Sequence, residues 1–406
     1  MSGRKRIAVL GSTGSVGRQA LEVAEWHPER FEIVALGARS DAALFREQVG
    51  RFRPRLAALT GPVRPAGAAG GPAEPPPAGL AGPPDDGWCP PSTRLLRGED
   101  SLTEIATAPD VDLVLVATSG TAGLAPTLAA LEMGRPVALA NKETLIMAGH
   151  LVMRAARRTG AAVIPVDSEH SAVWQCMFGE DPARVRKVIL TASGGAFRDL
   201  PLDRLADVTP AQALKHPNWS MGPKITVDSA TMMNKGLEVL EACWLFDLSV
   251  DDIEIVVHRE SIIHSLVEFV DGSLKAQLSS PDMRLPIQLA LSYPERISTP
   301  SARLDLAGLG KLSFEPLDAE RFRCAMLAMD AGRRGGTFPT VMNAANEVAV
   351  DLFLGGSVTF GQIPALTEAV MERHVPTRDP SLAEVYAADT WARDACRRLA
   401  LAPLPT

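Results

Sequence analysis

The sequence predicts an α/β protein with three parts: an N-terminal Rossmann-like parallel sheet, an α+β catalytic domain with a flexible loop, and a C-terminal helical domain. Short apolar runs alternate with amphipathic segments through the first 166 residues, as in parallel sheets whose strands are joined by helices. A glycine-rich turn, Gly11 to Gly17, follows the first apolar run. Beyond residue 318 the pattern is helical, with breaks at Gly355-Gly356 and Pro376.

The elements of the N-terminal part follow from their apolar patterns. A half-buried helix is expected after the first strand, because Val16, Ala20, Val23 and Ala24 share one face. Ser101 and Glu104 have the spacing of a capping box that begins another helix. A third helix carries an apolar stripe of leucines at 124, 128 and 131. Six strands are predicted here, at Ile7–Leu10, Glu32–Leu36, Leu56–Leu59, Asp112–Ala117, Val137–Ala140 and Ala162–Val166.

The expected domain boundaries come from changes in this pattern. Residues 1–157 form the first domain, and residues 158–292 form a second domain of mixed strands and helices, with strands at 187–191, 253–257 and 274–277. Prolines at 294, 300 and 316 make residues 293–318 a linker. Residues 319–406 form the helical domain.

Residues 61–93 interrupt the sheet pattern. This tract is rich in Pro, Gly and Ala, and its proline runs exclude regular helix and central strand. We expect an irregular excursion from the sheet, and a docking site for a proline-motif partner is the alternative.

Composition limits the class of protein. A chain of 406 residues with 46% hydrophobic and 22% charged residues is typical of a globular protein of two or three domains. The net charge of -7 argues against a nucleic-acid partner. No apolar run approaches the roughly 20 residues of a membrane helix, so we expect no membrane partner. Five scattered cysteines without a CxxC pair favour a reducing, cytoplasmic location.

The glycine-rich turn predicts a dinucleotide site. Gly11, Gly14 and Gly17 stand between a strand and a helix, where glycines allow a tight turn and the helix N-terminus offers N–H groups to a pyrophosphate. Arg39 and Ser40 follow the second strand, where an NAD site would carry an acidic residue. They suit the 2′-phosphate of NADPH, although Asp41 just beyond weakens that inference.

Polar motifs also follow the fifth and sixth predicted strands. Asn141-Lys142-Glu143 comes after one, and Asp167-Ser168-Glu169-His170 comes after the other. On an extended segment, Asp167 and Glu169 share a face and present two carboxylates to one point, where a cation relieves their repulsion. Oxygen ligands select Mg²⁺ or Mn²⁺. The alternative is that both residues cap the next helix. Because ligands of open α/β sheets bind at the carboxyl ends of the strands, four polar motifs there favour a site.

A further segment, residues 216–238, is dense in polar residues that packing alone does not favour. Ser229, Asn234 and Lys235 offer hydrogen-bond donors beside the carboxylate of Glu238. This set suits a phosphorylated substrate next to a metal ion. A polar loop before an ordinary helix is the alternative when this segment is taken by itself.

Together these motifs resemble the 1-deoxy-D-xylulose 5-phosphate reductoisomerase family. The matching strings include GSTGSVG at Gly11, LANKE at Leu139, PVDSEH at Pro165, TASGGAFR at Thr191, HPNWSMG at His216 and VDSATMMNKGLE at Val227, with HSLVEF, PDMR and NAANE further on. They run in order from residue 7 to about 350. The chain departs from the family pattern at Arg39-Ser40-Asp41, at Pro223 and in the proline-rich tract.

The resemblance implies an activity, a set of residues and roles for the domains: residues 1–157 would bind NADPH, and residues 158–292 would be the catalytic and dimerisation domain. The activity is the NADPH-dependent rearrangement and reduction of 1-deoxy-D-xylulose 5-phosphate to 2-C-methyl-D-erythritol 4-phosphate, in isoprenoid precursor biosynthesis of a bacterial homodimer. Asp167, Glu169 and Glu238 would bind Mg²⁺ or Mn²⁺, with Glu169, Lys142 and His216 as catalytic residues. The sugar phosphate substrate would contact Lys142, Ser168, Glu169, Ser193, His216, Trp219, Met221, Ser229, Asn234, Lys235 and Glu238. NADPH would contact Gly11, Thr13, Gly14, Ser15, Val16, Gly17, Arg39, Ser40, Asn141, Glu143 and Gly222.

The expected chemistry is metal-assisted rearrangement followed by hydride transfer. The base that removes the hydroxyl proton is Glu169 or a metal-bound water, and the sequence does not choose between them. We expect Trp219 to lie on a loop that closes over the substrate, with a permanently packed anchor as the alternative. Two other classes remain open: a dehydrogenase without rearrangement, which in its thioester form needs a reactive cysteine such as Cys176, and a non-catalytic NADPH sensor.

Overall fold

A computed structural model describes residues 3–61, 87–215 and 221–401 of the chain. These residues form two compact units. The first comprises residues 1–144, 152–167 and 283–301, and the second comprises residues 145–151, 168–282 and 302–406. The three-domain division expected from the sequence stays a prediction, but the segment 283–301 groups with the N-terminal sheet and not with the residues that precede it.

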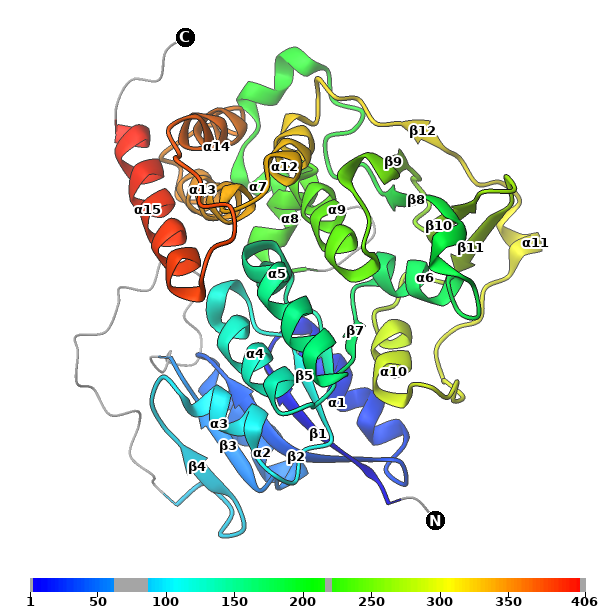
Figure 1. The fold of residues 1–406 in the computed structure, drawn as a ribbon, viewed down its shortest axis with the longest axis vertical. Coiled ribbons are helices and arrows are strands. Elements are labelled where there is room, and N and C mark those ends of the chain that lie inside the picture. The colour runs from blue at the N-terminus through cyan, green and yellow to red at the C-terminus, as the bar shows by residue number, and fades with distance from the viewer. Residues whose placement is uncertain (1–2, 62–86, 216–220, 402–406) are drawn as a thin grey trace. The chain divides into compact units, whose positions relative to one another are not determined.

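The first unit is built on a seven-stranded parallel sheet with the strand order β4-β3-β2-β1-β5-β6-β7 (Figure 1). The order reverses between β1 and β5, and a ligand crevice forms at such a reversal in open α/β sheets. Apolar residues fill the central strands, and β5 is buried along its whole length. The strands are β1 Lys5–Leu10, β2 Phe31–Ala38, β3 Leu56–Leu59, β4 Arg94–Leu96, β5 Leu113–Val116, β6 Val137–Leu139 and β7 Val163–Pro165.

Helices connect these strands and bury one apolar face each. On α1, the residues turned inward are Gly17, Ala20, Leu21, Val23 and Ala24. The helix α10, which comes much later in the chain, packs against α1 within the same unit. The helices are α1 Ser15–Trp26, α2 Ala42–Phe52, α3 Ser101–Thr107, α4 Leu124–Glu132, α5 Lys142–Thr159 and α10 Arg284–Ser292, with a 3-10 turn at Gly120–Gly123.

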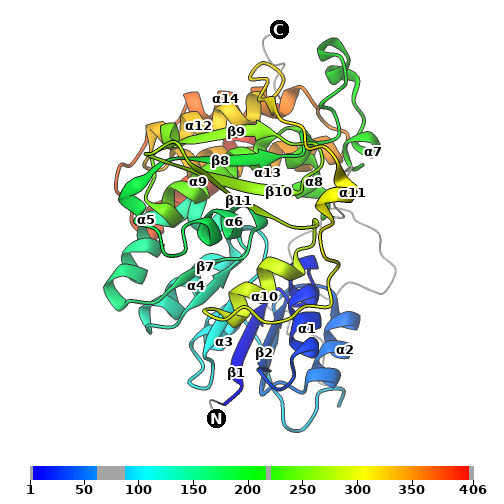
Figure 2. The same ribbon diagram turned by 90° about the vertical axis from the view of Figure 1, so that its right-hand side faces the viewer.

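The second unit contains a five-stranded mixed sheet with the order β11-β10-β8-β9-β12 (Figure 2). Only β8 and β9 are parallel, and the other neighbours are antiparallel. Helices α6 and α9 cover it, and their side chains Val173 and Val239 share one core cluster with Val188 and Leu190 of β8. The strands are β8 Val185–Ala192, β9 Ile253–Val257, β10 Ile263–Phe269, β11 Leu274–Leu278 and β12 Glu315–Pro316.

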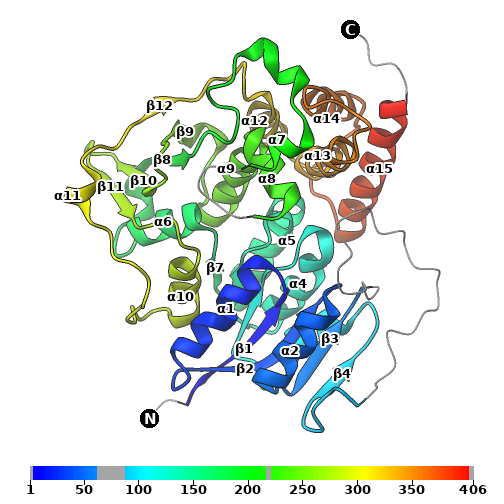
Figure 3. The ribbon, with the colours of Figure 1, turned by 180° about the vertical axis from the view of Figure 1, so that it is seen from behind.

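Helices α8, α12, α14 and α15 pack against α13, which is almost entirely buried (Figure 3), and α7 and α11 are short helices elsewhere in the second unit. Besides α6 Ser168–Cys176 and α9 Met233–Phe246, the helices of this unit are α7 Pro210–Ala213, α8 Pro223–Ala230, α11 Leu306–Leu309, α12 Arg323–Arg334, α13 Phe338–Leu354, α14 Gln362–Glu372 and α15 Leu382–Leu401. Turns of 3-10 helix lie at Pro182–Arg184, Leu202–Asp207 and Val250–Asp252. Among the described residues, no helix combines the length and the apolar composition that a membrane span requires.

The predicted strands are all present, and three further strands were not predicted. β10 carries polar residues at His264 and Ser265, which hide its apolar pattern, and β4 and β12 are very short. The expected linker contains α11 and β12, which pairs with β9. The capping box at Ser101 was wrong: Ser101 is the first residue of α3, and its hydroxyl donates to Gly98 O at 2.6 Å. Most of the tract 61–93 lies outside the described residues, and its described part, residues 61 and 87–93, contains no helix or strand.

Candidate active site

The glycine-rich turn leaves the N-terminus of α1 available to an anion. Gly11 has a φ of +90°, and a Cβ atom there would lie 2.3 Å from Ala117 O. A Cβ atom on Gly17 would lie 2.2 Å from Gly11 O, so both positions require glycine. The helix begins at Ser15, after Gly14, with no side-chain cap and no acidic residue in its first turn. Its first N–H groups therefore face the position where a pyrophosphate binds in this motif. Thr13 and Val16 lie in the same turn.

The end of β2 has the charge that a 2′-phosphate needs. Arg39 is exposed and makes no ion pair within the described part of the chain. Asp41, the residue that weakened the NADPH inference, caps α2: its Oδ1 accepts from Leu44 N at 3.0 Å. Because this carboxylate already accepts a hydrogen bond from the first turn of α2, it is less suited to bind ribose hydroxyls. Ser40 stands between the two residues.

Asn141, just after β6, is buried and forms hydrogen bonds to several neighbouring segments. Its Oδ1 accepts from Thr144 N at 3.0 Å and so caps α5. Its Nδ2 donates to Thr118 O at 2.9 Å and to Gly120 O at 3.0 Å, and it also contacts Glu143 Oε2 at 2.9 Å. These bonds hold the loop after β5 in place. The expected contact of Asn141 and Glu143 with NADPH stays a prediction. The amide nitrogen of Asn141 already donates hydrogen bonds to Thr118 O and Gly120 O.

The motif after β7 differs from its prediction. Asp167 and Glu169 were expected on an extended segment, but α6 begins at Ser168, so Asp167 lies in a bend and Glu169 in the first helical turn. The helix starts there because Ser168 and Glu169 suit a first turn, where a negative charge is favourable. The Ser168 hydroxyl donates to Glu169 Oε2 at 2.6 Å, and the Lys142 ammonium contacts Asp167.

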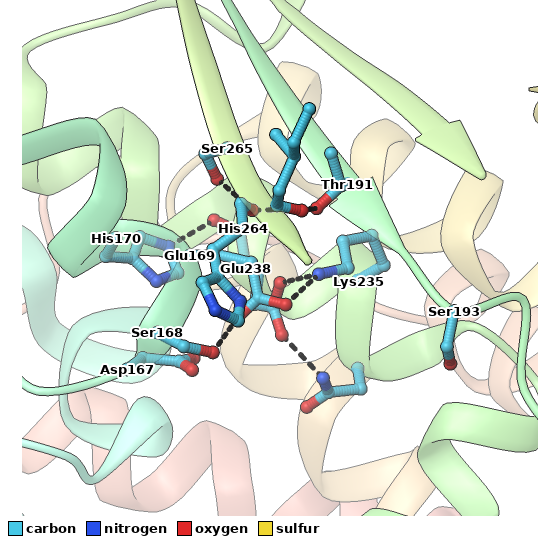
Figure 4. Close-up of polar contacts among 12 residues, drawn as sticks. Asp167, Ser168, Glu169, His170, Thr191, Ser193, Lys235, Glu238, His264 and Ser265 are labelled. Carbon is cyan, nitrogen blue, oxygen red and sulfur yellow. Dashed lines mark hydrogen bonds and ion pairs between the residues drawn. The ribbon is translucent and has the colours of Figure 1, made fainter. Parts of the chain in front are cut away.

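Helix α9 supplies the partners of Glu169 (Figure 4). Lys235 Nζ donates to Glu169 Oε1 at 2.9 Å and also contacts the carboxylate of Glu238, one turn further along the helix. Asn234 Nδ2 donates to Glu238 Oε1 at 2.5 Å. Lys235 and Glu238 are buried because α9 packs closely on α12 at Gly236, where a Cβ atom would lie 2.5 Å from Ala328 Cβ.

The electrostatics of this cluster keep Lys235 charged. Burial of the ammonium lowers the pKa of Lys235, but the attraction of Glu169 and Glu238 and the hydrogen bonds to them outweigh burial. The pKa of Lys235 is therefore raised. A buried cation between two carboxylates shows that the site requires positive charge, because isolated buried carboxylates are costly.

The carboxylates fit a hard divalent ion. Within the second unit, one oxygen of Glu169 and one of Glu238 lie within 4.8 Å of each other. Asp167 directly precedes Ser168 in the chain. Donor atoms that are all oxygen suit Mg²⁺ or Mn²⁺. A second group in the same unit consists of His170 and Glu241, whose ligand atoms also lie within 4.8 Å of each other, and its nitrogen ligand is less suited to Mg²⁺.

Two histidines, His170 and His264, lie near these charged residues and were not predicted as site residues. His170 Nε2 lies 2.8 Å from Glu238 O, and His264 Nε2 lies 2.9 Å from Ser279 Oγ. Burial lowers the pKa of His264, which favours a neutral ring. The Thr191 hydroxyl donates to His264 O at 2.8 Å. A histidine at the start of an apolar strand and one beside an acidic pair were the signals available in the sequence.

The predicted phosphate ligands fall into two groups. Asn234 and Lys235 point toward the carboxylates, while Ser193 lies apart from them (Figure 4). The turn after Ser193 packs on Ser229, since a Cβ atom on Gly195 would lie 2.4 Å from Ser229 O. Met221 and Gly222 immediately precede α8, and Gly222 is its N-cap residue. His216 and Trp219, with the closing loop expected there, lie outside the described residues.

The cysteines do not form a nucleophilic site. Cys176 is buried, and desolvation raises the pKa of its thiol to about 11. A thiol with such a pKa is protonated at neutral pH and is a poor nucleophile. This removes the support for a thioester-forming dehydrogenase.

Family models match most of the chain. The model described as "1-deoxy-D-xylulose 5-phosphate reductoisomerase" matches residues 7–65 and 89–149. The model for the "1-deoxy-D-xylulose 5-phosphate reductoisomerase C-terminal domain" matches residues 163–246, and that for the "DXP reductoisomerase C-terminal domain" matches residues 278–395.

Curated and solved relatives agree with these matches. Proteins named 1-deoxy-D-xylulose 5-phosphate reductoisomerase from Pelotomaculum thermopropionicum and Shouchella clausii are 52% and 51% identical over 96% of this chain, and the matches cover 97% and 98% of the relatives. The solved structure from Zymomonas mobilis in complex with NADPH is 38% identical, with a TM-score of 0.85 over 98% of this chain and 100% of its own. A DOX-P reductoisomerase solved with NADPH, fosmidomycin and magnesium is 37% identical, with a TM-score of 0.86 over 97% of this chain and 98% of its own.

Proposed function

This chain belongs to the 1-deoxy-D-xylulose 5-phosphate reductoisomerase family and is an NADPH- and metal-dependent oxidoreductase that converts 1-deoxy-D-xylulose 5-phosphate into 2-C-methyl-D-erythritol 4-phosphate, and we propose which of its residues do this work. The observation that carries the proposal is the pair of carboxylates, Glu169 and Glu238, around the buried ammonium of Lys235. That arrangement provides oxygen ligands and a place for positive charge at one point.

Asp167, Glu169 and Glu238 hold the divalent ion in this proposal. The oxygens of Glu169 and Glu238 lie within 4.8 Å of each other, Asp167 immediately precedes α6, and Glu238 is nearly inaccessible to water. Ser168 and Asn234 hold the carboxylates of Glu169 and Glu238 by hydrogen bonds, which fixes the direction of the ligand oxygens. When bound, the ion supplies Lewis acidity for the carbonyl of the substrate.

The N-terminus of α1 and the end of β2 bind the cofactor. The uncapped N–H groups after Gly14 suit the pyrophosphate, and Arg39 with Ser40 suits the 2′-phosphate. Asp41 does not oppose this, because it caps α2. NADPH supplies the hydride once it is bound.

The substrate is held by its phosphate and by its hydroxyl groups. Lys235 and Asn234 lie beside the metal-binding carboxylates, and Ser229 and Ser193 lie on the segments that meet at Gly195. We assign these four residues to the phosphate, which matches donor groups to a dianion. Binding energy from the phosphate can then fix the sugar in its reactive geometry.

Proton removal falls to Glu169 in this proposal. Its two oxygens accept from Lys235 and Ser168, and these hydrogen bonds hold the carboxylate in a fixed position. Lys142 contacts Asp167 and adds positive charge at the start of α5, where it can meet the oxygens of the substrate. The role expected for His216 stays a prediction.

A homodimer in the cytoplasm, as the family resemblance implies, is also part of the proposal. Sedimentation equilibrium of the purified chain checks the dimer, and a mass of one chain at micromolar concentration would contradict it.

The activity is tested directly by the oxidation of NADPH at 340 nm with 1-deoxy-D-xylulose 5-phosphate. We expect turnover only when Mg²⁺ or Mn²⁺ is present, and loss of turnover with EDTA that either ion restores. The product is identified by mass spectrometry and NMR as the branched 2-C-methyl-D-erythritol 4-phosphate. A straight-chain reduced sugar phosphate would instead indicate a dehydrogenase without rearrangement.

A further inference from the structure

A buried polar network joins α13 to α8 and α9 within the second unit. Helices α8 and α13 lie side by side (Figures 1 and 3). Asp228 of α8 is 1% exposed, and Asn346 of α13 is fully buried. Around them the core consists of apolar side chains such as Met342, Ala345 and Ala349. A charged and an amide side chain in such a core require an explanation.

Each carboxylate oxygen of Asp228 has its own partner. Asn346 Nδ2 donates to Asp228 Oδ1 at 2.9 Å, and Lys224 Nζ lies 2.8 Å from Asp228 Oδ2, one turn earlier on α8. Both contacts suit an ionised carboxylate and hold its plane in one orientation. The Oδ1 atom of Asn346 has no hydrogen-bond partner among the described residues, so this amide carries a cost that packing does not offset.

The network continues into the segment that we assign to the substrate phosphate. Ser229 follows Asp228 directly, and its carbonyl lies against Gly195, two residues after Ser193. The Thr231 hydroxyl donates to the backbone carbonyl of Asp228 at 3.3 Å, and Met233 N donates to Thr231 Oγ1 at 3.3 Å. These contacts connect the end of α8 to the first residue of α9.

Helix α9 carries the remaining phosphate and metal-site residues close to its start. Asn234 and Lys235 are its second and third residues. Met232, between the two helices, has a φ of +60°, a left-handed conformation that is unfavourable for a side chain of its size. Such a conformation persists where its surroundings hold it, and the Asp228–Thr231–Met233 contacts are part of those surroundings.

From this geometry we infer that Asp228, held between Asn346 and Lys224, is a positioning residue that aligns Ser229 and the start of α9 for the phosphate of the substrate. The inference rests on the proposed function, in which Ser229, Asn234 and Lys235 bind that phosphate. Through Asn346, the C-terminal helix α13 would then help to position the residues that bind the substrate phosphate, although it lies far from them in the sequence.

The test compares variants of the full-length enzyme by steady-state kinetics at saturating NADPH and Mg²⁺. Asp228→Asn keeps the shape of the side chain but removes its charge, and Asn346→Leu removes the amide. We expect each to raise the KM for 1-deoxy-D-xylulose 5-phosphate by about 10- to 100-fold, the range found for displaced supporting residues. The KM for NADPH should stay unchanged.

Asn343→Leu is the matched control. Asn343 is also fully buried on α13 and donates to Glu347 at 3.2 Å within its own helix, and among the described residues it makes no hydrogen bond to Asp228. We expect its KM for the substrate to stay at the wild-type value. Thermal melts of every variant check folding, and Lys224→Met replaces Asp228→Asn if that variant does not fold.

A second substrate separates positioning from general damage. The unphosphorylated sugar 1-deoxy-D-xylulose, assayed as kcat/KM, lacks the group that the network serves. Its kcat/KM should fall far less than that of the phosphorylated substrate in Asp228→Asn and Asn346→Leu. Equal losses for both sugars would show a general structural role and overturn the inference.

Ser229→Ala distinguishes the inference from the function on which it rests. A raised KM for Ser229→Ala beside an unchanged KM for Asp228→Asn would overturn the inference alone. An unchanged KM for Ser229→Ala would overturn the assignment of the phosphate site, and the inference with it.

Discussion

Lys235 and Glu238 stand one turn apart on α9 as a buried ion pair, with 4% and 1% of their surfaces exposed. The same ammonium also donates to Glu169 of α6. The pair therefore joins two helices whose residues are far apart in the sequence, and it places positive charge where we propose that a metal ion binds.

Replacing Glu238 by Gln should weaken metal binding and spare cofactor binding. The change keeps the size of the side chain but removes a negative charge from the ligand set. We expect Mn²⁺ affinity, measured by electron paramagnetic resonance titration, to fall at least about tenfold, as for other groups of a metal site. NADPH affinity, measured by fluorescence, should not change.

Glu241→Gln is the control for this prediction, since Glu241 is buried on the same helix and belongs to the second group, with His170. If Glu241→Gln loses Mn²⁺ and Glu238→Gln keeps it, the ion binds at the second group.

Replacing Lys235 by Met should destabilise the metal-free protein. The change leaves two carboxylates in a buried site without their cation, and removing one partner of a buried ion pair costs about 3–5 kcal/mol. Urea unfolding in EDTA should show this loss. Added Mn²⁺ should recover much of it, because the ion restores positive charge between the carboxylates.

Lys187→Met provides the comparison, because Lys187 pairs with Glu254 and Glu268 at a more exposed position. Its loss should be within about 1 kcal/mol, and Mn²⁺ should not affect it. Similar losses for both variants, with no recovery by Mn²⁺, would argue against a cation site at Lys235.

Replacing Arg39 by Ala should reduce the preference for NADPH over NADH. A charge-assisted hydrogen bond to the 2′-phosphate contributes about 1.5–3 kcal/mol, which corresponds to a fall of about 10- to 150-fold in the ratio of kcat/KM values. Asp41→Asn should leave the ratio near that of the wild type, because Asp41 serves as the cap of α2. If Arg39→Ala leaves the ratio unchanged, Ser40 or a backbone N–H group discriminates between the cofactors.

Thiol reagents should leave the enzyme active. Desolvation raises the pKa of the Cys176 and Cys396 thiols to about 11 and that of the Cys243 and Cys324 thiols to about 12. At pH 7.5 these groups are protonated and unreactive. Mass spectrometry after iodoacetamide treatment should find no label at these four positions in the native protein. Inactivation that accompanies labelling of Cys176 would revive the thioester-forming alternative.

The strands of the parallel sheet were predictable from local sequence because each is a short apolar run between helical patterns. The prediction for β5, for example, agrees with the structure to within one residue at each end. Motifs at strand ends were equally visible, because the carboxyl ends of parallel strands share an edge whatever the details of packing. β10 was missed, since His264 and Ser265 are polar residues that only the completed sheet buries.

The amino-acid sequence by itself determined the class of the fold, the family and the types of residue available for binding metal, phosphate and cofactor. The tertiary structure decided which of these residues meet. Lys235 reaches Glu169 across 66 positions of sequence, and Asn346 reaches Asp228 across 118. It also decided that Glu169 lies on a helix and that Asp41 caps one. The physical reason is that backbone propensity acts over a few residues, whereas burial and charge pairing depend on which elements pack together.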